Sequence, residues 1–299
     1  MPILAVRDSA LPGTTDLPCV LARLPSRAPV VVMIHGFGFD PFDPQSDPHL
    51  HILGLDPDRR RWGAVSWPRR LDLAGDRGLG VAWGWPSTGT IWQANAQAAA
   101  QGKKLARFIG ILRALDGQRP VHVIAHSLGA RVAYSALTDL GPNDVQRVVL
   151  IAPALSLAEA RAACRSPAGR MAMFVNVTGR ENRLFDALLL AALPYRGRRL
   201  ARRSICDDNW LDLALDDPDV LGTLRQWGWR IRPARVRICH WSGYLRPGVW
   251  RLYQDLLLRP DETPLSCLRT ATSGPRGPKG LRSVSLQRLK ALVRRGVPS

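Results

Sequence analysis

The chain has 299 residues, of which 46% are hydrophobic, and this composition fits one large α/β domain or two small ones. It contains no uncharged apolar run of about 18 residues, no signal-peptide core at the N-terminus and no closely spaced cysteine pair, so we expect a cytoplasmic protein without a membrane span or structural zinc. The net charge of +18 attracts anionic surfaces non-specifically, but no basic motif with interleaved aromatic residues predicts a specific nucleic-acid partner.

The first strong structural signal is a β-branched run at 30–34, which predicts a buried central strand. The small-residue turn His35-Gly36-Phe37 follows it. Residues 40–79 are rich in proline, aspartate and arginine and show little periodicity, so we expect a long excursion over the end of the sheet. His49 and His51 form an H-x-H pair there, but no D-H follows the pair, so we predict a surface loop and no metal site.

From residue 80 onward, apolar strand patterns and amphipathic helix patterns alternate. This alternation predicts an α/β fold with a doubly wound, mostly parallel sheet and helices on both faces. A helical insertion is expected from Phe185 to Leu193 and from Trp210 to Trp227. The other expected strands are 80–85, 121–125, 147–151, 171–177 and 236–239, and the other expected helices are 90–115, 128–137, 156–163 and 249–258.

The sequence Ala-His-Ser-Leu-Gly at 125–129 stands between a predicted strand and a predicted helix. It matches the G-x-S-x-G nucleophile elbow, with alanine at the first position. A sharp turn of this kind exposes the hydroxyl of Ser127 and directs the amide of Leu128 to the place where an oxyanion would form. The amide of Phe37, in the turn after 30–34, is the second oxyanion donor that we expect. A helix N-cap is the structural alternative for Ser127.

An activated serine needs a base and a group that orients the base. Of the six histidines, only His240 follows Ser127 in the chain, and it stands directly after a predicted strand. Glu181 is the carboxylate closest to the strand that ends at Thr178, and Asp186 is five residues further along. We prefer Glu181 as the acid, with a salt bridge as the structural alternative for either carboxylate.

Five features together resemble the α/β-hydrolase superfamily: the turn at 35–37, the sequence Trp-Pro-Ser at 85–87, the elbow at 125–129, the acidic loop after the strand that ends at Thr178, and His240. The Trp-Pro-Ser strand end and the HSLG elbow are similar to a poorly characterised bacterial branch of esterase-like proteins, over about residues 28–258. This resemblance implies a Ser-acid-His triad, hydrolysis of an ester or related acyl bond in a small molecule, and no cofactor.

The acid position of that family, in a G-x-x-D pattern, falls on Asn182 here. Either Glu181 or Asp186 therefore substitutes for it, or the triad is incomplete. The candidate substrate-binding residues are Trp85, His126 and Phe39. The candidates for an apolar acyl pocket are Trp83, Trp85, Trp92 and Trp241. Tryptophans at these spacings are equally typical of a hydrophobic core.

We therefore expect a hydrolase domain at 1–258, with candidate lid segments at 40–79 and 185–235. A basic flexible tail follows at 259–299, with nine basic and two acidic residues and a candidate amphipathic helix from Ser285 to Arg295. The first hypothesis is a serine hydrolase acting on a carboxylic ester. The alternatives are a non-catalytic binding protein, which Asn182 favours, and a weak binder of anionic surfaces through residues 260–299.

Overall fold

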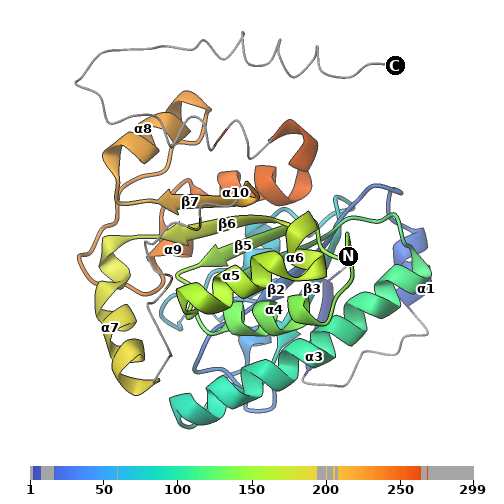
Figure 1. The fold of residues 1–299 in the computed structure, drawn as a ribbon, viewed down its shortest axis with the longest axis horizontal. Coiled ribbons are helices and arrows are strands. Elements are labelled where there is room, and N and C mark those ends of the chain that lie inside the picture. Colours follow the sequence, from blue (N-terminus) through green and yellow to red (C-terminus); the bar gives the residue numbers. More distant parts are fainter. Residues whose placement is uncertain are drawn as a thin grey trace.

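A computed structural model describes residues 3–7, 17–58, 60–193, 200, 205, 208–263 and 268. Seven parallel strands form one sheet in the order β1-β3-β2-β4-β5-β6-β7, which confirms the predicted α/β fold (Figure 1). The strands are β1 (Ile3–Arg7), β2 (Val30–Ile34), β3 (Leu79–Gly84), β4 (Val121–His126), β5 (Arg147–Ile151), β6 (Met173–Thr178) and β7 (Trp210–Ala214).

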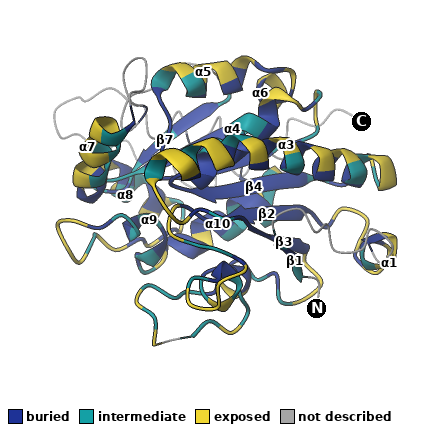
Figure 2. Cartoon of the chain, turned by 90° about the horizontal axis from the view of Figure 1, so that it is seen from below, coloured by how far each residue is buried: buried dark blue, intermediate teal, exposed yellow. Residues whose placement is uncertain are grey.

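Helices cover both faces of the sheet, as Figure 2 shows from below. Every residue of β2 is buried, because alternate side chains point into two separate cores. The described helices are α1 (Leu17–Ala22), α2 (Trp67–Arg70), α3 (Ile91–Leu115), α4 (Gly129–Thr138), α5 (Leu157–Arg165), α6 (Pro167–Met171), α7 (Arg183–Ala192), α8 (Pro218–Gln226), α9 (Ser242–Leu245) and α10 (Val249–Leu258).

The two cores are built from different helices. Val30, Val32 and Ile34 pack in the core that also contains residues of α1, α3, α4 and α5. Val31 and Met33 pack in the second core, with residues of α2, α8 and α10. Burial of two apolar layers by a continuous β-branched strand supplies the main driving force for this architecture.

The sequence prediction was wrong for two segments near the C-terminal end of the sheet. Residues 210–214 form strand β7 rather than the start of a helix, and α8 begins only at Pro218, with Asp217 as its N-cap. Residues 236–239 form a loop rather than the last strand. Strand β7 already occupies the position beside β6, and the loop is held instead by a backbone bond from Cys239 N to the carbonyl of Glu181.

The structure adds one strand at the N-terminus and leaves several sequence predictions untested. The edge strand β1 pairs with β3, and it was not among the predicted elements. The candidate helix at 285–295 lies outside the described residues, and the predicted domain boundary and lids stay predictions. No helix in the described part of the chain combines the length and apolar character needed to cross a membrane.

Strand β4 carries a fully buried histidine at the end remote from the elbow. The ring of His122 forms no hydrogen bond to another side chain among the described residues, and Arg147, also buried, lies in the neighbouring strand, opposite His122 in register. Burial, reinforced by this positive charge, lowers the pKa of His122 to about 3. The ring is therefore neutral in the folded protein at physiological pH.

This burial predicts acid lability. Because the pKa of His122 is lower in the folded than in the unfolded chain, the unfolded state binds more protons below about pH 6.5. Stability is complete above that pH and falls by about 1.4 kcal/mol per pH unit from this group as the pH drops toward 3. The free energy of unfolding, measured in urea at pH 7.5 and 5.5, should fall more for the wild type than for His122→Leu. An equal loss between the two pH values in both proteins would contradict the lowered pKa of His122.

Candidate active site

The elbow at the end of β4 holds Ser127 in a left-handed backbone conformation, with φ of 53°. Its amide donates to the carbonyl of Ile151 at 2.9 Å, which ties the turn to the end of β5. Glycine is required next to this turn, because a Cβ added at Gly129 would lie 2.4 Å from the carbonyl oxygen of His35. A Cβ added at Gly36 would lie 2.9 Å from the Cβ of Ser127. The elbow is therefore enclosed on both sides by backbone.

The structure brings Ser127 and His240 together, although they are far apart in sequence. The Nε2 atom of His240 lies 2.7 Å from the Oγ atom of Ser127. The Nδ1 atom of His240 lies 2.6 Å from the Oδ1 atom of Asn182. An amide oxygen only accepts hydrogen bonds, so this contact places the proton of a neutral imidazole on Nδ1 and leaves Nε2 free to accept from the serine hydroxyl.

Glu181, the preferred acid at the sequence level, lies elsewhere. It belongs to the short 3₁₀ turn η2 (Arg180–Asn182), and its buried carboxylate accepts hydrogen bonds from Arg246 and Ser242. Burial alone would raise the pKa of Glu181, but these hydrogen bonds and the guanidinium charge outweigh it, and the pKa is lowered. Glu181 therefore carries a negative charge that Arg246 balances.

Asp186, the alternative acid, is half-buried in the first turn of α7, one helical turn beyond Asn182. The two nitrogens of the His240 ring lie within hydrogen-bond distance of Asn182 and Ser127, and the carboxylate of Glu181 binds Arg246 and Ser242 instead. The physical reason is the turn η2: consecutive residues of a 3₁₀ turn point about 120° apart, so Asn182 faces the histidine while Glu181 faces the opposite side of the same loop.

Glu181 and its partners instead fix the loop that carries His240. The backbone carbonyl of Glu181 accepts from Cys239 N, one residue before the histidine, and its carboxylate binds Ser242, two residues after it. Arg246 also donates to the Oγ atom of Ser242 and to the carbonyl of Leu215. This buried network connects the ends of β6 and β7 to the His240 loop.

Two rings pack directly on His240. Phe185 from α7 stacks on it with ring centroids 4.8 Å apart, and His126 lies 4.6 Å away. Burial lowers the pKa of His126 to about 4, so its ring is neutral and donates from Nε2 to the carbonyl of His240 at 3.1 Å. His126, predicted to bind substrate, is almost fully buried and supports the histidine loop from below.

The turn after β2 is held by the segment that follows β3. Trp85 is fully buried, and its backbone amide donates to the Nε2 atom of His35 at 3.0 Å. Ser87 donates to the carbonyl of Gly36 and accepts from the amide of Phe39. The side chain of Trp85 has no exposed surface in this structure and supports the turn, and its role in substrate binding stays a prediction.

The predicted oxyanion donors belong to the turn after β2 and to the elbow itself. Among the described residues, the backbone amides of Phe37 and Leu128 donate no hydrogen bond, so both are available to a ligand. Phe39, a predicted substrate-binding residue, is half-buried between the rings of His35 and His51 at the mouth of this turn.

The H-x-H pair in the long segment serves a structural purpose. Asp47 accepts from His49 Nδ1 at 2.9 Å and pairs with Arg7 of β1. The other nitrogen of His49 lies 3.2 Å from the carbonyl of Ala82 in β3. His51 lies against the carbonyl of Trp62. No cluster of metal-binding side chains occurs within the described ranges.

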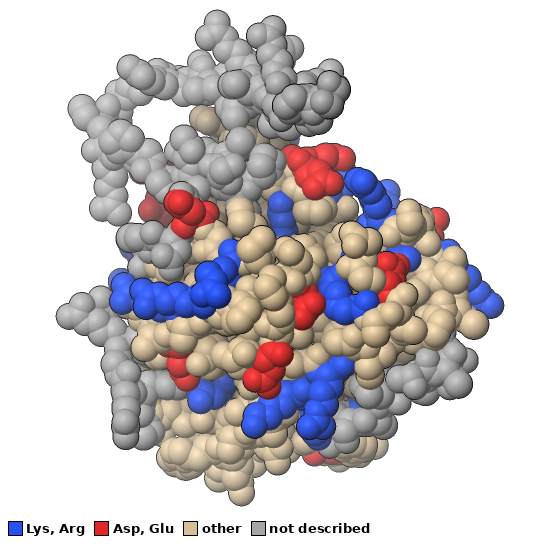
Figure 3. Space-filling model, turned by 45° about the vertical axis from the view of Figure 1, so that its right-hand side comes forward, with Lys and Arg blue, Asp and Glu red and all other residues tan. Residues whose placement is uncertain are grey.

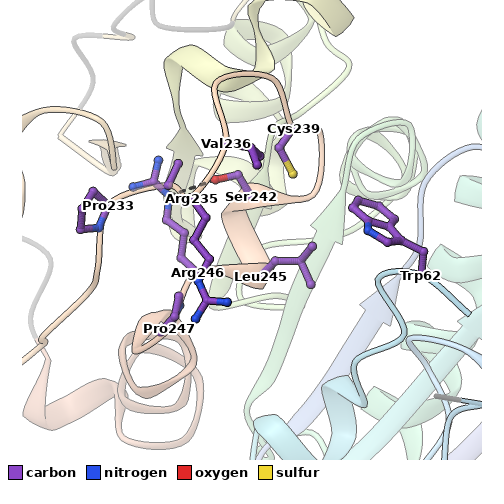
Figure 4. Close-up of a pocket in the computed structure, with 10 residues that line it drawn as sticks. Trp62, Pro233, Arg235, Val236, Cys239, Ser242, Leu245, Arg246 and Pro247 are labelled. Carbon is purple, nitrogen blue, oxygen red and sulfur yellow. Dashed lines mark hydrogen bonds between the residues drawn. The ribbon is translucent and has the colours of Figure 1, made fainter. Parts of the chain in front are cut away.

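A cavity of about 340 Å³ lies beside the histidine loop, on the side of Cys239 and Ser242 (Figure 4). Trp62 forms one wall, and its ring packs edge-on against that of Trp241 with centroids 4.6 Å apart. The opposite walls come from the loop before His240 and from the segment after it. The full lining is Trp62, Pro233, Ala234, Arg235, Val236, Cys239, Ser242, Leu245, Arg246 and Pro247.

Sequence reasoning did not find Ser242 and Arg246, which stand in the largely apolar sequence Ser-Gly-Tyr-Leu-Arg-Pro-Gly-Val-Trp. A single arginine in a largely apolar stretch indicates a buried guanidinium with a carboxylate partner, and this pattern could have identified Arg246 from the sequence.

The network predicts a strong coupling between Glu181 and Arg246. Arg246→Met should lower the free energy of unfolding by about 3–5 kcal/mol, because it leaves a buried carboxylate without its cation. The double variant Glu181→Gln/Arg246→Met should lose less than the sum of the two single variants. Urea unfolding measures this, with the exposed pair of Asp56 and Arg69 as a control: Asp56→Asn should stay close to wild type. Additive losses would show that the pair is not coupled.

Comparison with known proteins agrees with the geometry. Residues 20–185, more than half of the chain, match the model of a family described as "Alpha/beta hydrolase of unknown function (DUF900)". The chain is also 34% identical over 207 residues to a rice (Oryza sativa subsp. japonica) protein named "Transmembrane and coiled-coil domain-containing protein STS1". That match covers 57% of this chain and 31% of the rice protein, so the chain spans about a third of its relative. The chain belongs to the alpha/beta hydrolase family DUF900.

Proposed function

We propose that this protein is a serine hydrolase that cleaves a carboxylic ester, or a related acyl bond, through Ser127, His240 and Asn182. The observation that carries the proposal is the continuous hydrogen-bonded chain from Asn182 Oδ1 through the imidazole of His240 to Ser127 Oγ, with distances of 2.6 and 2.7 Å. A helix N-cap serine needs no base, and an incidental histidine needs no partner on both nitrogens.

The proposed reaction starts with attack of Ser127 Oγ on the carbonyl carbon of the ester, while His240 Nε2 takes the hydroxyl proton. The carbonyl oxygen becomes an oxyanion that accepts from the amides of Phe37 and Leu128. His240 then gives its proton to the leaving alcohol, which leaves an acyl-enzyme on Ser127. Water, deprotonated by the same histidine, releases the carboxylic acid and restores the serine. No step of this sequence needs a cofactor.

Asn182 stands where the acid of a Ser-acid-His triad would contact the histidine, and this substitution affects the expected kcat. Its amide oxygen accepts from Nδ1–H and so fixes the productive tautomer and orientation of His240. It carries no charge, so it does not neutralise the imidazolium that forms during attack. We therefore expect a working but slow hydrolase. The same neutral side chain favours the alternative of a non-catalytic binding protein, which predicts no turnover of any ester.

The direct test is turnover of a soluble ester such as p-nitrophenyl acetate. The wild type should hydrolyse it above the solution background, and Ser127→Ala and His240→Ala should each lose about 10³-fold or more in kcat. Ser46→Ala, at an exposed hydroxyl in the long loop, serves as the control and should match wild type. Folded wild type with no more activity than Ser127→Ala would contradict the hydrolase proposal.

Position 182 allows a sharper test of the mechanism. Asn182→Asp should raise kcat by about tenfold or more, because the carboxylate stabilises the imidazolium in the transition state. The same negative charge should raise the pKa of His240, so the acidic limb of the pH–rate profile should move to higher pH. Asn182→Leu should lower kcat, because no acceptor then fixes the tautomer. Equal kcat values and pH profiles for all three proteins would show that residue 182 does not orient His240.

A further inference from the structure

The loop that leads into His240 presents an unusual combination of side chains to solvent. Residues 232–238 read Arg-Pro-Ala-Arg-Val-Arg-Ile, and Val236 and Ile238 are 55% and 58% exposed. Arg232, Arg235 and Arg237 are also exposed, and none of them forms an ion pair within the described residues. The loop therefore offers exposed positive charge and exposed apolar side chains in the same seven residues.

The arrangement differs from the charged surface elsewhere. On the face drawn in Figure 3, basic and acidic groups are interspersed. Many arginines of the described chain pair with nearby carboxylates, as Arg60 does with Asp58 and Arg77 does with Asp72. Exposed valine and isoleucine side chains between exposed arginines are typical of segments that contact a lipid headgroup region.

The exposed apolar surface continues onto α7. In Figure 1, α7 and the segment between α8 and α9 lie along the same side of the molecule, where β5 ends. No residue of α7 is fully buried, and Leu184 and Leu188 are 47% and 57% exposed. Between them, Phe185 stacks on the ring of His240. The two exposed leucines therefore flank a side chain that touches the proposed base.

Trp62 extends the same surface from the long segment after β2. Its side chain is 65% exposed, although its ring also contacts Trp241. The cavity of about 340 Å³ is lined by Trp62, by Val236 of the loop and by Cys239 and Ser242, which flank His240 in the sequence (Figure 4). Its largely apolar walls suit a hydrocarbon chain rather than a polar ligand.

We infer that this surface docks on an anionic lipid bilayer and that the ester substrate is carried by a lipid. The docking surface consists of Trp62, Leu184, Leu188, Val236, Ile238 and the arginines of 232–238. Its apolar side chains enter the headgroup region, the arginines bind anionic headgroups, and the cavity beside the His240 loop receives an acyl chain that leaves the bilayer. The lipid substrate rests on the proposed hydrolase function, whereas the docking does not.

Vesicle sedimentation tests the docking without catalysis. Full-length Ser127→Ala protein is mixed with vesicles of phosphatidylcholine alone or with added phosphatidylglycerol. It should partition onto the anionic vesicles at least about tenfold more strongly, and added salt should weaken this binding. In the same background, Val236→Ser/Ile238→Ser and Arg235→Gln/Arg237→Gln should each lower the partition coefficient by about tenfold or more.

Two control variants carry the same types of substitution on surfaces remote from the loop. Leu115→Ser/Met171→Ser removes exposed apolar side chains at the end of α3 and at α6, and Arg107→Gln/Arg161→Gln removes exposed charges on α3 and α5. Both should leave binding unchanged. Equal binding to both vesicle types, no binding, or unchanged binding of the loop variants would overturn the docking inference.

Failure of the docking and failure of the proposed function are distinguishable. A protein that hydrolyses a soluble ester but ignores anionic vesicles refutes only the docking inference. A protein that binds vesicles through this loop but hydrolyses no ester refutes the hydrolase proposal. If both hold, Arg237→Gln and Ile238→Ser, at loop residues that do not line the cavity, should each lose activity on vesicle-embedded esters while keeping kcat on the soluble ester.

Discussion

The site depends on the left-handed backbone of Ser127. A non-glycine residue in this conformation is strained by about 1–3 kcal/mol, and the surrounding structure must hold it there. Ile151 accepts the serine amide, and His35 and Ile34 leave room only for glycine at position 129. The turn after β2 is in turn fixed by Trp85 and Ser87, so the two candidate oxyanion amides and the serine hydroxyl share one rigid frame. The two cores behind the central strands make that frame stable enough to store the strain.

Two adjacent residues divide the work that a single carboxylate performs in a Ser-acid-His triad. Glu181 carries the charge but uses it to anchor the His240 loop through Arg246 and Ser242, while Asn182 contacts the imidazole without charge. The site therefore positions its histidine firmly and stabilises the imidazolium weakly. A continuous hydrogen-bonded chain therefore exists without a carboxylate on His240, and under the proposed mechanism residue 182 is the position that tunes the rate.

The sequence predicted the fold and the Ser127–His240 pair more reliably than the geometry around them. Strands β2 and β5 and helix α10 were placed correctly, because continuous β-branched runs and a clear apolar stripe leave little choice. Strand β7 was missed because Asp212 interrupts its apolar pattern, although Asn176 and the indole of Trp210 both bind that carboxylate. Residues 236–239 alternate like a strand but have no free neighbour in the sheet. Whether Glu181 or Asn182 faces His240 depends on the rotation of one 3₁₀ turn. The G-x-x-D pattern of the resembled family pointed to position 182, but the search for a carboxylate favoured Glu181.

The central claim is that Ser127 is an activated nucleophile paired with His240. Labelling with a fluorophosphonate probe, followed by digestion and mass mapping of the adduct, tests it most directly because it requires no knowledge of the natural substrate. The account predicts a single adduct on Ser127 in the wild type, no adduct in Ser127→Ala, and much slower labelling in folded His240→Ala. A folded wild-type protein that stays unlabelled, or that labels equally fast without His240, would contradict it.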